Sequence, residues 1–257
     1  MPGYRRIRVG IASSRRSRFA LIVVAAWSAG SAAAAGHWGG SVGYASDNFL
    51  HGRSVSNGAP AWFGGVHHDD GGWIIGLQAT GEHPEGQSRG AQFGLHVDRR
   101  WRFGDDWTAQ LGVIHYESPR NDDATDLRYN EVNARVGWRG RVSLAFAHVP
   151  DLPWFDASSG GFRRGRASYS EAGFHQPLAR RLSLDLGLGY ADLRDVRLLR
   201  PRGTPLRDYA YASAGLRYGL GDVFLYVTVI HARPPPADYS GNVEPGTQWV
   251  GAVVWSF

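Results

Sequence analysis

The feature that constrains this chain most is a repeated alternation of apolar and polar residues in about twelve segments. In residues 182–191, leucines and a tyrosine fill every second position, while Ser183, Asp185 and small residues fill the positions between them. A period of two residues is the signature of a β-strand whose two faces meet different surroundings. The segments lie approximately at residues 38–46, 60–68, 73–81, 89–101, 107–117, 127–138, 141–149, 166–176, 181–192, 208–219, 222–232 and 247–257. The chain is therefore predicted to be all-β.

Short and long connections alternate between these segments. The short ones are 69–72, 102–106, 139–140, 177–180 and 220–221, and the long ones are 47–59, 82–88, 118–126, 150–165, 193–207 and 233–246. After residue 35, no stretch approaches the roughly 18 consecutive apolar residues of a membrane-spanning helix. Short turns on one rim and longer loops outside are typical of outer-membrane barrels. The pattern predicts a transmembrane antiparallel up-and-down β-barrel of about 12 strands over residues 36–257, with the long connections outside.

The last strand favours a barrel over a soluble sandwich. Trp249, Gly251, Val253, Trp255 and Phe257 share one face of it. Exposed aromatic residues at a strand end suit the lipid–water interface of a membrane. Trp255 and Phe257 also resemble the C-terminal signal that the barrel-assembly machinery reads in bacterial outer-membrane proteins, so this machinery is an expected partner. Further tryptophans near strand ends predict two aromatic girdles, namely Trp38, Trp62, Trp73, Trp101, Trp107 and Trp138.

Residues 1–35 have the layout of a secretory signal peptide. They carry six arginines and no acid, then an apolar run at 19–27 and a small-residue cleavage site at Ala33-Ala34-Ala35. A signal anchor is the alternative, but the apolar run is short for a spanning helix of about 20 residues. The chain has 28 Arg+Lys against 23 Asp+Glu. Since the segment beyond residue 35 has one more acid than base, no nucleic-acid partner is expected.

The polar face of the predicted strands supplies the candidate lumen. Twelve strands at the usual spacing and tilt give a backbone diameter of roughly 24 Å, which inward side chains narrow further. Charges of both signs on this face either bias the passage of ions and small solutes or pair across the lumen as a polar core. The candidates for the solute path are His96, Asp98, Arg100, Glu131, Asn133, Arg135, Glu171, His175, Asp185, Tyr211 and Arg217.

Catalytic and metal chemistry receives little support. A Ser-His-acid lipid hydrolase is possible around His51, Ser54 and Ser56, or around His115, Glu117 and Ser118. On a strand, however, Ser118 faces away from His115 and Glu117, and Asn57-Gly58 is a turn dipeptide. The chain has no Cys, which excludes thiolate metal sites and Cys nucleophiles. We therefore expect no enzyme activity, no cofactor and no metal.

A short N-terminal stretch resembles a known family. Ser46-Asp47-Asn48-Phe49-Leu50-His51-Gly52-Arg53-Ser54 is followed by Pro60-Ala61, by Gly64-Gly65 and by Gly71-Gly72-Trp73 with Gly76. These residues resemble the opening of the TorF-family porins of proteobacteria. Leu50-His51 stands where that family has an aromatic residue and Arg, and Val55 replaces a Gln. The resemblance implies a barrel fold in the bacterial outer membrane.

Three functions remain open from the sequence. The first is a narrow porin for ions or small solutes, the second a structural or adhesive barrel with a plugged lumen, and the third a lipid hydrolase. Outer-membrane lipid and lipopolysaccharide are expected partners, because the arginines of 163–166 and 194–207 fall in predicted outer loops and suit phosphate groups. The oligomeric state stays open.

Overall fold

The structure, a computed structural model, describes residues 21–22, 36–82, 90–118, 128–156, 161–193, 198–199, 205–206, 208–233 and 246–257. Within these ranges, no helix has the length and apolar character needed to cross a membrane. The predicted signal peptide lies outside the described residues except for β1 (Leu21–Ile22), which pairs with β3. The cleavage of residues 1–35 stays a prediction.

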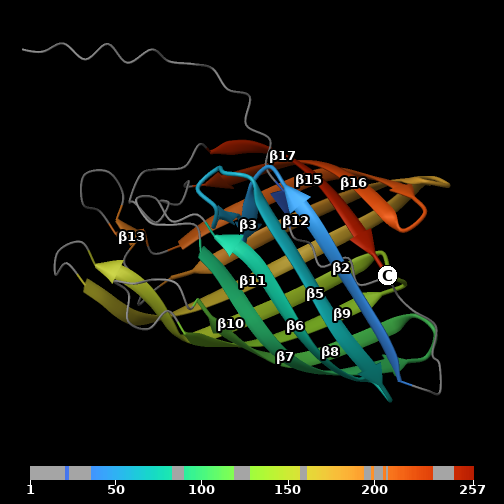
Figure 1. Cartoon of the computed structure of the whole chain (residues 1–257), viewed down its shortest axis with the longest axis horizontal. Coiled ribbons are helices and arrows are strands. Elements are labelled where there is room, and N and C mark those ends of the chain that lie inside the picture. Colours follow the sequence, from blue (N-terminus) through green and yellow to red (C-terminus); the bar gives the residue numbers. More distant parts are fainter. Residues whose placement is uncertain are drawn as a thin grey trace, which may run out of the picture.

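Twelve antiparallel strands close into a barrel, as predicted (Figure 1). The last strand, β17 (Thr247–Ser256), pairs with the first barrel strand, β2 (His37–Ala45). The main chain of Phe257 also exchanges hydrogen bonds with Gly40, so the hydrogen-bond ladder closes the barrel between these two strands. Four short strands lie in the connections between barrel strands: β3 (Asn48–Leu50), β4 (Arg53–Ser54), β13 (Leu198–Leu199) and β14 (Pro205–Leu206). The barrel strands are β2 (His37–Ala45), β5 (Ala61–Asp70), β6 (Trp73–Glu82), β7 (Gly90–Phe103), β8 (Trp107–Glu117), β9 (Tyr129–Trp138), β10 (Val142–Asp156), β11 (Gly161–Ala179), β12 (Leu182–Asp192), β15 (Asp208–Leu220), β16 (Val223–Arg233) and β17 (Thr247–Ser256).

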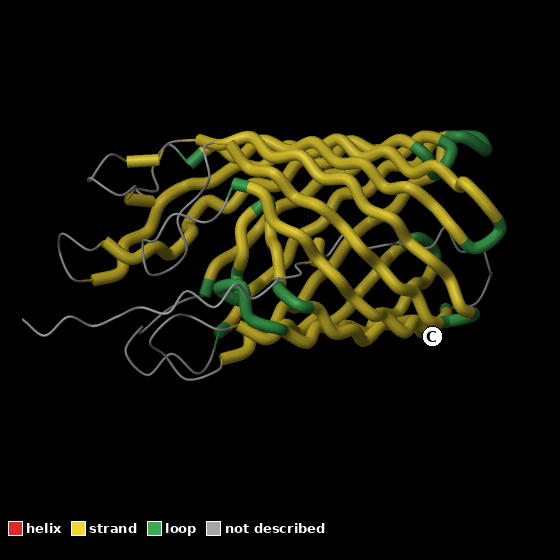
Figure 2. Tube along the Cα trace, turned by 90° about the horizontal axis from the view of Figure 1, so that it is seen from above, coloured by secondary structure: helices red, strands yellow, loops and turns green. Residues whose placement is uncertain are grey.

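All five short connections lie at one end of the barrel (Figure 2). Gly71 and Gly72 both have positive φ, as do Arg139 and Gly140, which suits tight turns between twisted strands. One predicted long loop is wrong: β10 and β11 continue through most of 150–165 as a paired ladder with a bulge between Val149 and Leu152. This part of β10 has no described pairing with β9. Within the described residues it pairs with β11 alone, and Pro150 lies in the bulge, a position where proline is tolerated.

The apolar faces of the strands point outward. Leu188 is 66% exposed and Leu144 60%, whereas their neighbours of opposite parity are buried or half-buried. Exposed aromatic residues form a girdle at the tight-turn end, namely Trp38, Trp73, Trp101, Phe103, Trp107, Trp138, Trp255 and Phe257. A second group lies toward the loop end, namely Tyr44, Trp62, Phe93, Tyr190 and Trp249. An apolar band between aromatic girdles is the exterior of a membrane barrel, as the sequence predicted.

Candidate functional site: a hairpin across the lumen

The connection between β2 and β5, residues 46–60, folds into the barrel. We call it the inner hairpin. Its strands β3 and β4 pair through Leu50 and Arg53, so His51 and Gly52 form a two-residue turn at its tip. Both turn residues have positive φ, 50° and 75°, as a type I′ turn requires. The prediction that residues 47–59 lie outside the barrel is therefore wrong.

Hydrogen bonds to the buried carboxylate of Asp47 give the inner hairpin its shape. The hydroxyls of Ser54 and Ser56 both donate to Asp47 Oδ1 at 2.6 Å. The Ser56 hydroxyl oxygen also accepts the backbone N–H of Asn48 at 2.8 Å. Burial raises the pKa of Asp47 to about 6, although the serine hydroxyls act in the opposite direction. This folded base fixes the course of the segment before it reaches its tip.

The base of the inner hairpin is attached to the wall from which it emerges. The Phe49 ring is buried among inward-facing side chains of β2, β5, β16 and β17, including Phe63, Ile230 and Val250. Asn48 Nδ2 donates to Thr80 Oγ1 on β6 at 2.6 Å. Apolar burial and a side-chain hydrogen bond thus hold the base against neighbouring strands.

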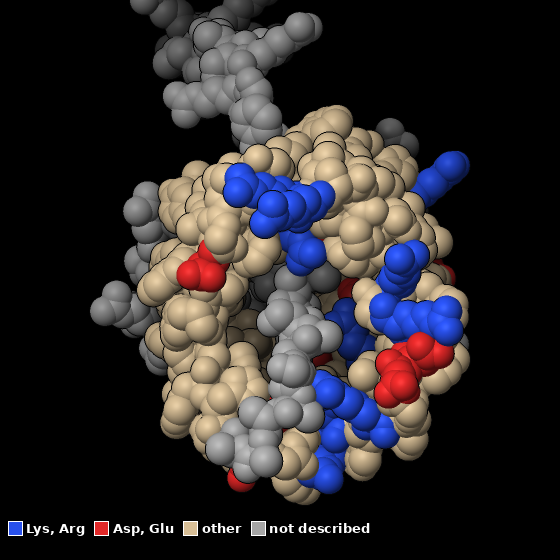
Figure 3. Space-filling view, turned by 90° about the vertical axis from the view of Figure 1, so that its right-hand side faces the viewer, with Lys and Arg blue, Asp and Glu red and all other residues tan. Residues whose placement is uncertain are grey.

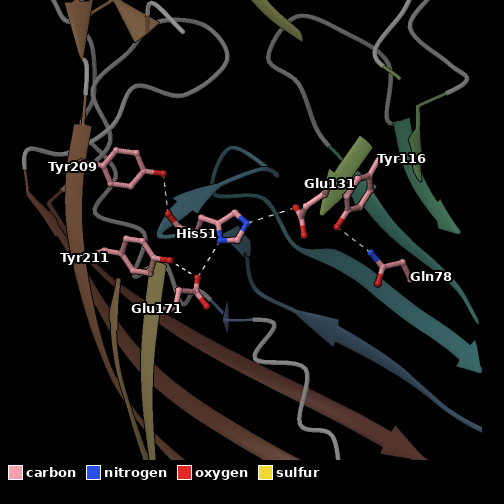
Figure 4. Close-up of polar contacts among 7 residues, drawn as sticks. All are labelled: His51, Gln78, Tyr116, Glu131, Glu171, Tyr209 and Tyr211. Carbon is pink, nitrogen blue, oxygen red and sulfur yellow. Dashed lines mark hydrogen bonds and ion pairs between the residues drawn. The ribbon is translucent and has the colours of Figure 1, made fainter. Parts of the chain in front are cut away.

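The tip of the inner hairpin reaches the opposite wall (Figure 4). His51 Nδ1 lies 3.0 Å from Glu171 Oε1 on β11, and Nε2 lies 4.0 Å from Glu131 Oε2 on β9. The imidazole stacks on Tyr169 with ring centroids 3.8 Å apart and planes at 9°. In the order of strands around the barrel, β10 and β11 lie opposite β2 and β5. The inner hairpin therefore crosses the full width of the lumen.

Two tyrosines of β15 secure the backbone of the tip. The Tyr209 hydroxyl donates to the carbonyl oxygen of His51 at 2.8 Å. Gly52 packs against the Tyr211 ring so closely that a Cβ there would overlap it. The Tyr211 hydroxyl donates in turn to Glu171 Oε1. Only glycine combines this close approach with a positive φ without strain.

The His51 imidazole carries a charge at neutral pH. Burial by itself lowers its pKa, but hydrogen bonds and charge attraction from Glu131 and Glu171 outweigh burial and raise the pKa to about 9. The side chain is 14% exposed, so the two carboxylates act on it with little screening by water. The tip is therefore held by an imidazolium placed between two acids.

The residues predicted from the sequence as lumen candidates all lie on the inner parity of their strands. Glu131, Glu171 and Tyr211 meet around the hairpin tip. Nearer the tight-turn end, three side-chain pairs form: His96 with Asp98 on the same strand β7 at 2.7 Å, Arg100 of β7 with Asp69 of β5 at 3.0 Å, and His175 of β11 with Asp185 of the neighbouring β12 at 2.6 Å. Arg217 donates to Ser183, and Asn133 and Arg135 lie on β9. Many lumen charges are thus paired.

Sequence reasoning considered His51 only for a hydrolase and missed its contacts with Glu131 and Glu171 in the lumen. His51 lies outside the alternating segments, and its partners Glu131 and Glu171 lie 80 and 120 positions further along the chain. Phe49, Leu50 and Val55 were the available signal, because apolar residues are unexpected in a solvent-exposed loop. The serines proposed for a hydrolase donate hydrogen bonds to Asp47, whereas His51 is hydrogen-bonded to Glu171 and lies 4.0 Å from Glu131. His115 lies on the outer face with Asn130 and Glu117.

The tight-turn end carries clusters of basic side chains around its rim (Figure 3). Exposed arginines lie in or beside the turns, namely Arg102, Arg139, Arg141, Arg180 and Arg181. Arg139 pairs with Asp106 through two hydrogen bonds of 2.8 and 3.1 Å. Within the described residues, no group of three or more His, Asp or Glu side chains is placed to hold a metal ion.

Comparison with solved structures identifies the architecture. The NanC porin superposes with a TM-score of 0.55 at 12% identity, covering 85% of this chain and 98% of that one. The chain has the fold of an outer-membrane porin. The KdgM porin gives a TM-score of 0.48 at 11% identity over 85% and 99% of the two chains. The COG4313 outer membrane channel from Pseudomonas putida F1 gives 0.48 at 12% identity over 88% and 97%.

No family model and no curated protein matches this sequence. At 12% identity, the structural likeness speaks to the porin fold alone. That fold and the apolar exterior with its aromatic girdles are those of a bacterial outer-membrane protein. The polar lumen and the inner hairpin inside it are then the features from which a function has to be argued.

Proposed function

We propose that the protein is a narrow outer-membrane porin for the passive passage of ions or small solutes. The observation that carries the proposal is the inner hairpin, which crosses a barrel of only twelve strands between ionised side chains. A barrel of roughly 24 Å backbone diameter has little free cross-section once a hairpin spans it. A passage beside the hairpin, lined by charged groups of both signs, suits small polar solutes.

Recording from the purified protein in a planar lipid bilayer tests this function. We expect discrete conductance steps that are small compared with those of wider porins, because the hairpin occupies much of the lumen. A silent protein that is nonetheless folded would favour a structural or adhesive barrel. Fatty-acid release from lipid vesicles would point instead to the lipid hydrolase.

The solute path should include Arg135. This side chain lies on the inner parity of β9, four residues from Glu131. Arg135→Glu reverses a charge in the lumen, so we expect the reversal potential in a KCl gradient to shift toward cation selectivity, with little loss of folding. Arg166→Glu is the matched control, because Arg166 is exposed on the outer parity of β11. Equal shifts in both variants would place Arg135 outside the path.

We also propose membership of the TorF-family porins, supported by the stretch 46–76, which contains the inner hairpin. Lipopolysaccharide is the proposed partner of the arginines on β11. Arg164 is exposed there and pairs with Asp151 at 3.0 Å, and its neighbours Arg163 and Arg166 are exposed as well. Trp255 and Phe257 are the proposed signal for the barrel-assembly machinery, since both side chains are about half exposed on the outer face.

A further inference from the structure

We propose that Glu131, Glu171 and Tyr169 form a binding site for planar organic cations, with His51 of the inner hairpin as its built-in occupant. A guanidinium or imidazolium group of a passing solute would take the place of the His51 ring. This inference rests on the proposed function, because it assumes that solutes enter the lumen.

The first argument is the geometry around the imidazole. Its ring lies flat on Tyr169, at a centroid distance of 3.8 Å and an angle of 9°. Glu171 approaches one ring nitrogen at 3.0 Å, and Glu131 approaches the other at 4.0 Å. An aromatic face below a flat cation and carboxylates at its edge are the arrangement that recognises guanidinium and imidazolium groups.

The second argument is that the wall supplies this site without the hairpin. Glu131 comes from β9, and Tyr169 and Glu171 come from β11, so strand pairing through β10 fixes all three. The Tyr211 hydroxyl holds the carboxylate of Glu171. If the His51 ring left, the buried Glu131 carboxylate and the partly exposed Glu171 carboxylate would lose the cation that lies between them, which is unfavourable for the buried one.

The third argument concerns how the ring can leave. The backbone of the tip is held separately, by the Tyr209 hydroxyl on the His51 carbonyl and by Gly52 against the Tyr211 ring. Rotation of the His51 side chain therefore does not require the hairpin to leave the wall. A solute cation can replace the ring while the hairpin still crosses the lumen.

The charges that face the site restrict the ligand. Two carboxylates repel anions, and a neutral solute cannot replace the imidazolium charge. Arg135 on β9 acts electrostatically on Glu171, which favours a single positive group rather than two. The flat stack on Tyr169 favours a planar ion over a tetrahedral ammonium. A side chain such as that of arginine meets all of these conditions.

Equilibrium dialysis of labelled guanidinium against the folded protein in detergent tests the site directly, with urea as the neutral probe of the same shape. We expect His51→Ala to bind guanidinium at least about tenfold more tightly than the wild type, because the competing ring is gone. Urea should bind to neither. Equal guanidinium binding by the two proteins, or equal binding of urea and guanidinium, would overturn the proposal.

A second carboxylate variant separates the site from general charge effects. His51→Ala combined with Glu171→Gln should lose at least about tenfold in guanidinium affinity. His51→Ala combined with Asp185→Asn is the matched control, because Asp185 pairs with His175 outside the site. Equal losses in both double variants would overturn the proposal. His51→Gln serves in place of His51→Ala if the latter fails the gel-shift test for folded barrels.

Bilayer recordings distinguish failure of this inference from failure of the proposed function. Current through His51→Ala should be blocked by millimolar guanidinium and not by urea. A protein that binds guanidinium in dialysis but conducts no current would keep the site and reject the porin. A protein that conducts but neither binds guanidinium nor is blocked by it would keep the porin and reject the site.

Discussion

Replacement of residues 46–60 by a two-residue Asn-Gly turn is expected to raise the single-channel conductance about two- to fivefold, by the scaling of current with free cross-section in a barrel of this size. Ala45 of β2 and Ala61 of β5 are direct register partners, so a two-residue turn can join them without disturbing the ladder. The strands β2 and β5 stay paired through eight further register positions down to His37 and Asp69. The barrel should therefore still close, with its lumen emptied of the hairpin.

The control for this deletion is a replaced turn at the other rim. Exchanging residues 139–141 between β9 and β10 for an Asn-Gly turn leaves the inner hairpin untouched. The conductance of this turn variant should equal that of the wild type. A hairpin deletion that folds and conducts no more than the wild type would mean that residues 46–60 do not limit the passage.

Raising the pH through about 9 is expected to free the His51 ring from Glu131 and Glu171 and to increase conductance and current noise, while Tyr209 and Gly52 still hold the backbone of the tip. The docked His51 has a pKa of about 9, raised by Glu131 and Glu171 against the effect of burial. An undocked histidine titrates near 6.5. The charge therefore stabilises docking fully below pH 6.5, and this contribution is lost as the pH rises from 6.5 through 9. It amounts to roughly 3 kcal/mol.

Other ionisable groups face His51 and limit the pH range in which the result can be read. They are Glu131 and Arg135 from β9, Tyr169 and Glu171 from β11, and Tyr209 and Tyr211 from β15. Carboxylates and arginine do not ordinarily titrate between pH 7 and 9.5, and phenols begin near 10. Because the pKa of Asp47 at the base of the hairpin is about 6, recordings between pH 7 and 9.5 report on His51. The conductance of His51→Gln should not change with pH in this range. A wild-type conductance equally independent of pH would contradict the proposed role of the His51 charge.

The barrel could be predicted from the sequence because its signal is local. Strand alternation in 182–191 and in the C-terminal strand depends only on which face meets lipid, so a single sequence carries it. The prediction of a long loop at 150–165 failed, because prolines usually end a strand but do not end this one. Pro150 and Pro153 indicate the end of a strand, yet β10 continues past them, paired with β11 beyond a bulge between Val149 and Leu152.

The hairpin site could not be predicted for a different reason. Parity placed Glu131 and Glu171 on the inner face, but which charges meet depends on strand register and on a connection with no periodic pattern. His51 is bound by residues of β9, β11 and β15 that are remote in sequence. Asn57-Gly58 was correctly predicted as a turn, since both residues have positive φ. Nothing local to it indicates that the segment turns inward.

Disulfide formation between Gly52→Cys and Tyr211→Cys is the most direct test that the hairpin folds into the lumen. The native chain has no Cys, so a cross-link between these positions would be unambiguous. A Cβ built on Gly52 lies 2.8 Å from the Tyr211 Cβ, and a shift of about 1 Å gives the usual separation in a disulfide. With the protein in outer membranes, we predict near-complete cross-linking, seen as a gel shift that reductant reverses. Two thiols that stay free under oxidation in a folded barrel would contradict the account.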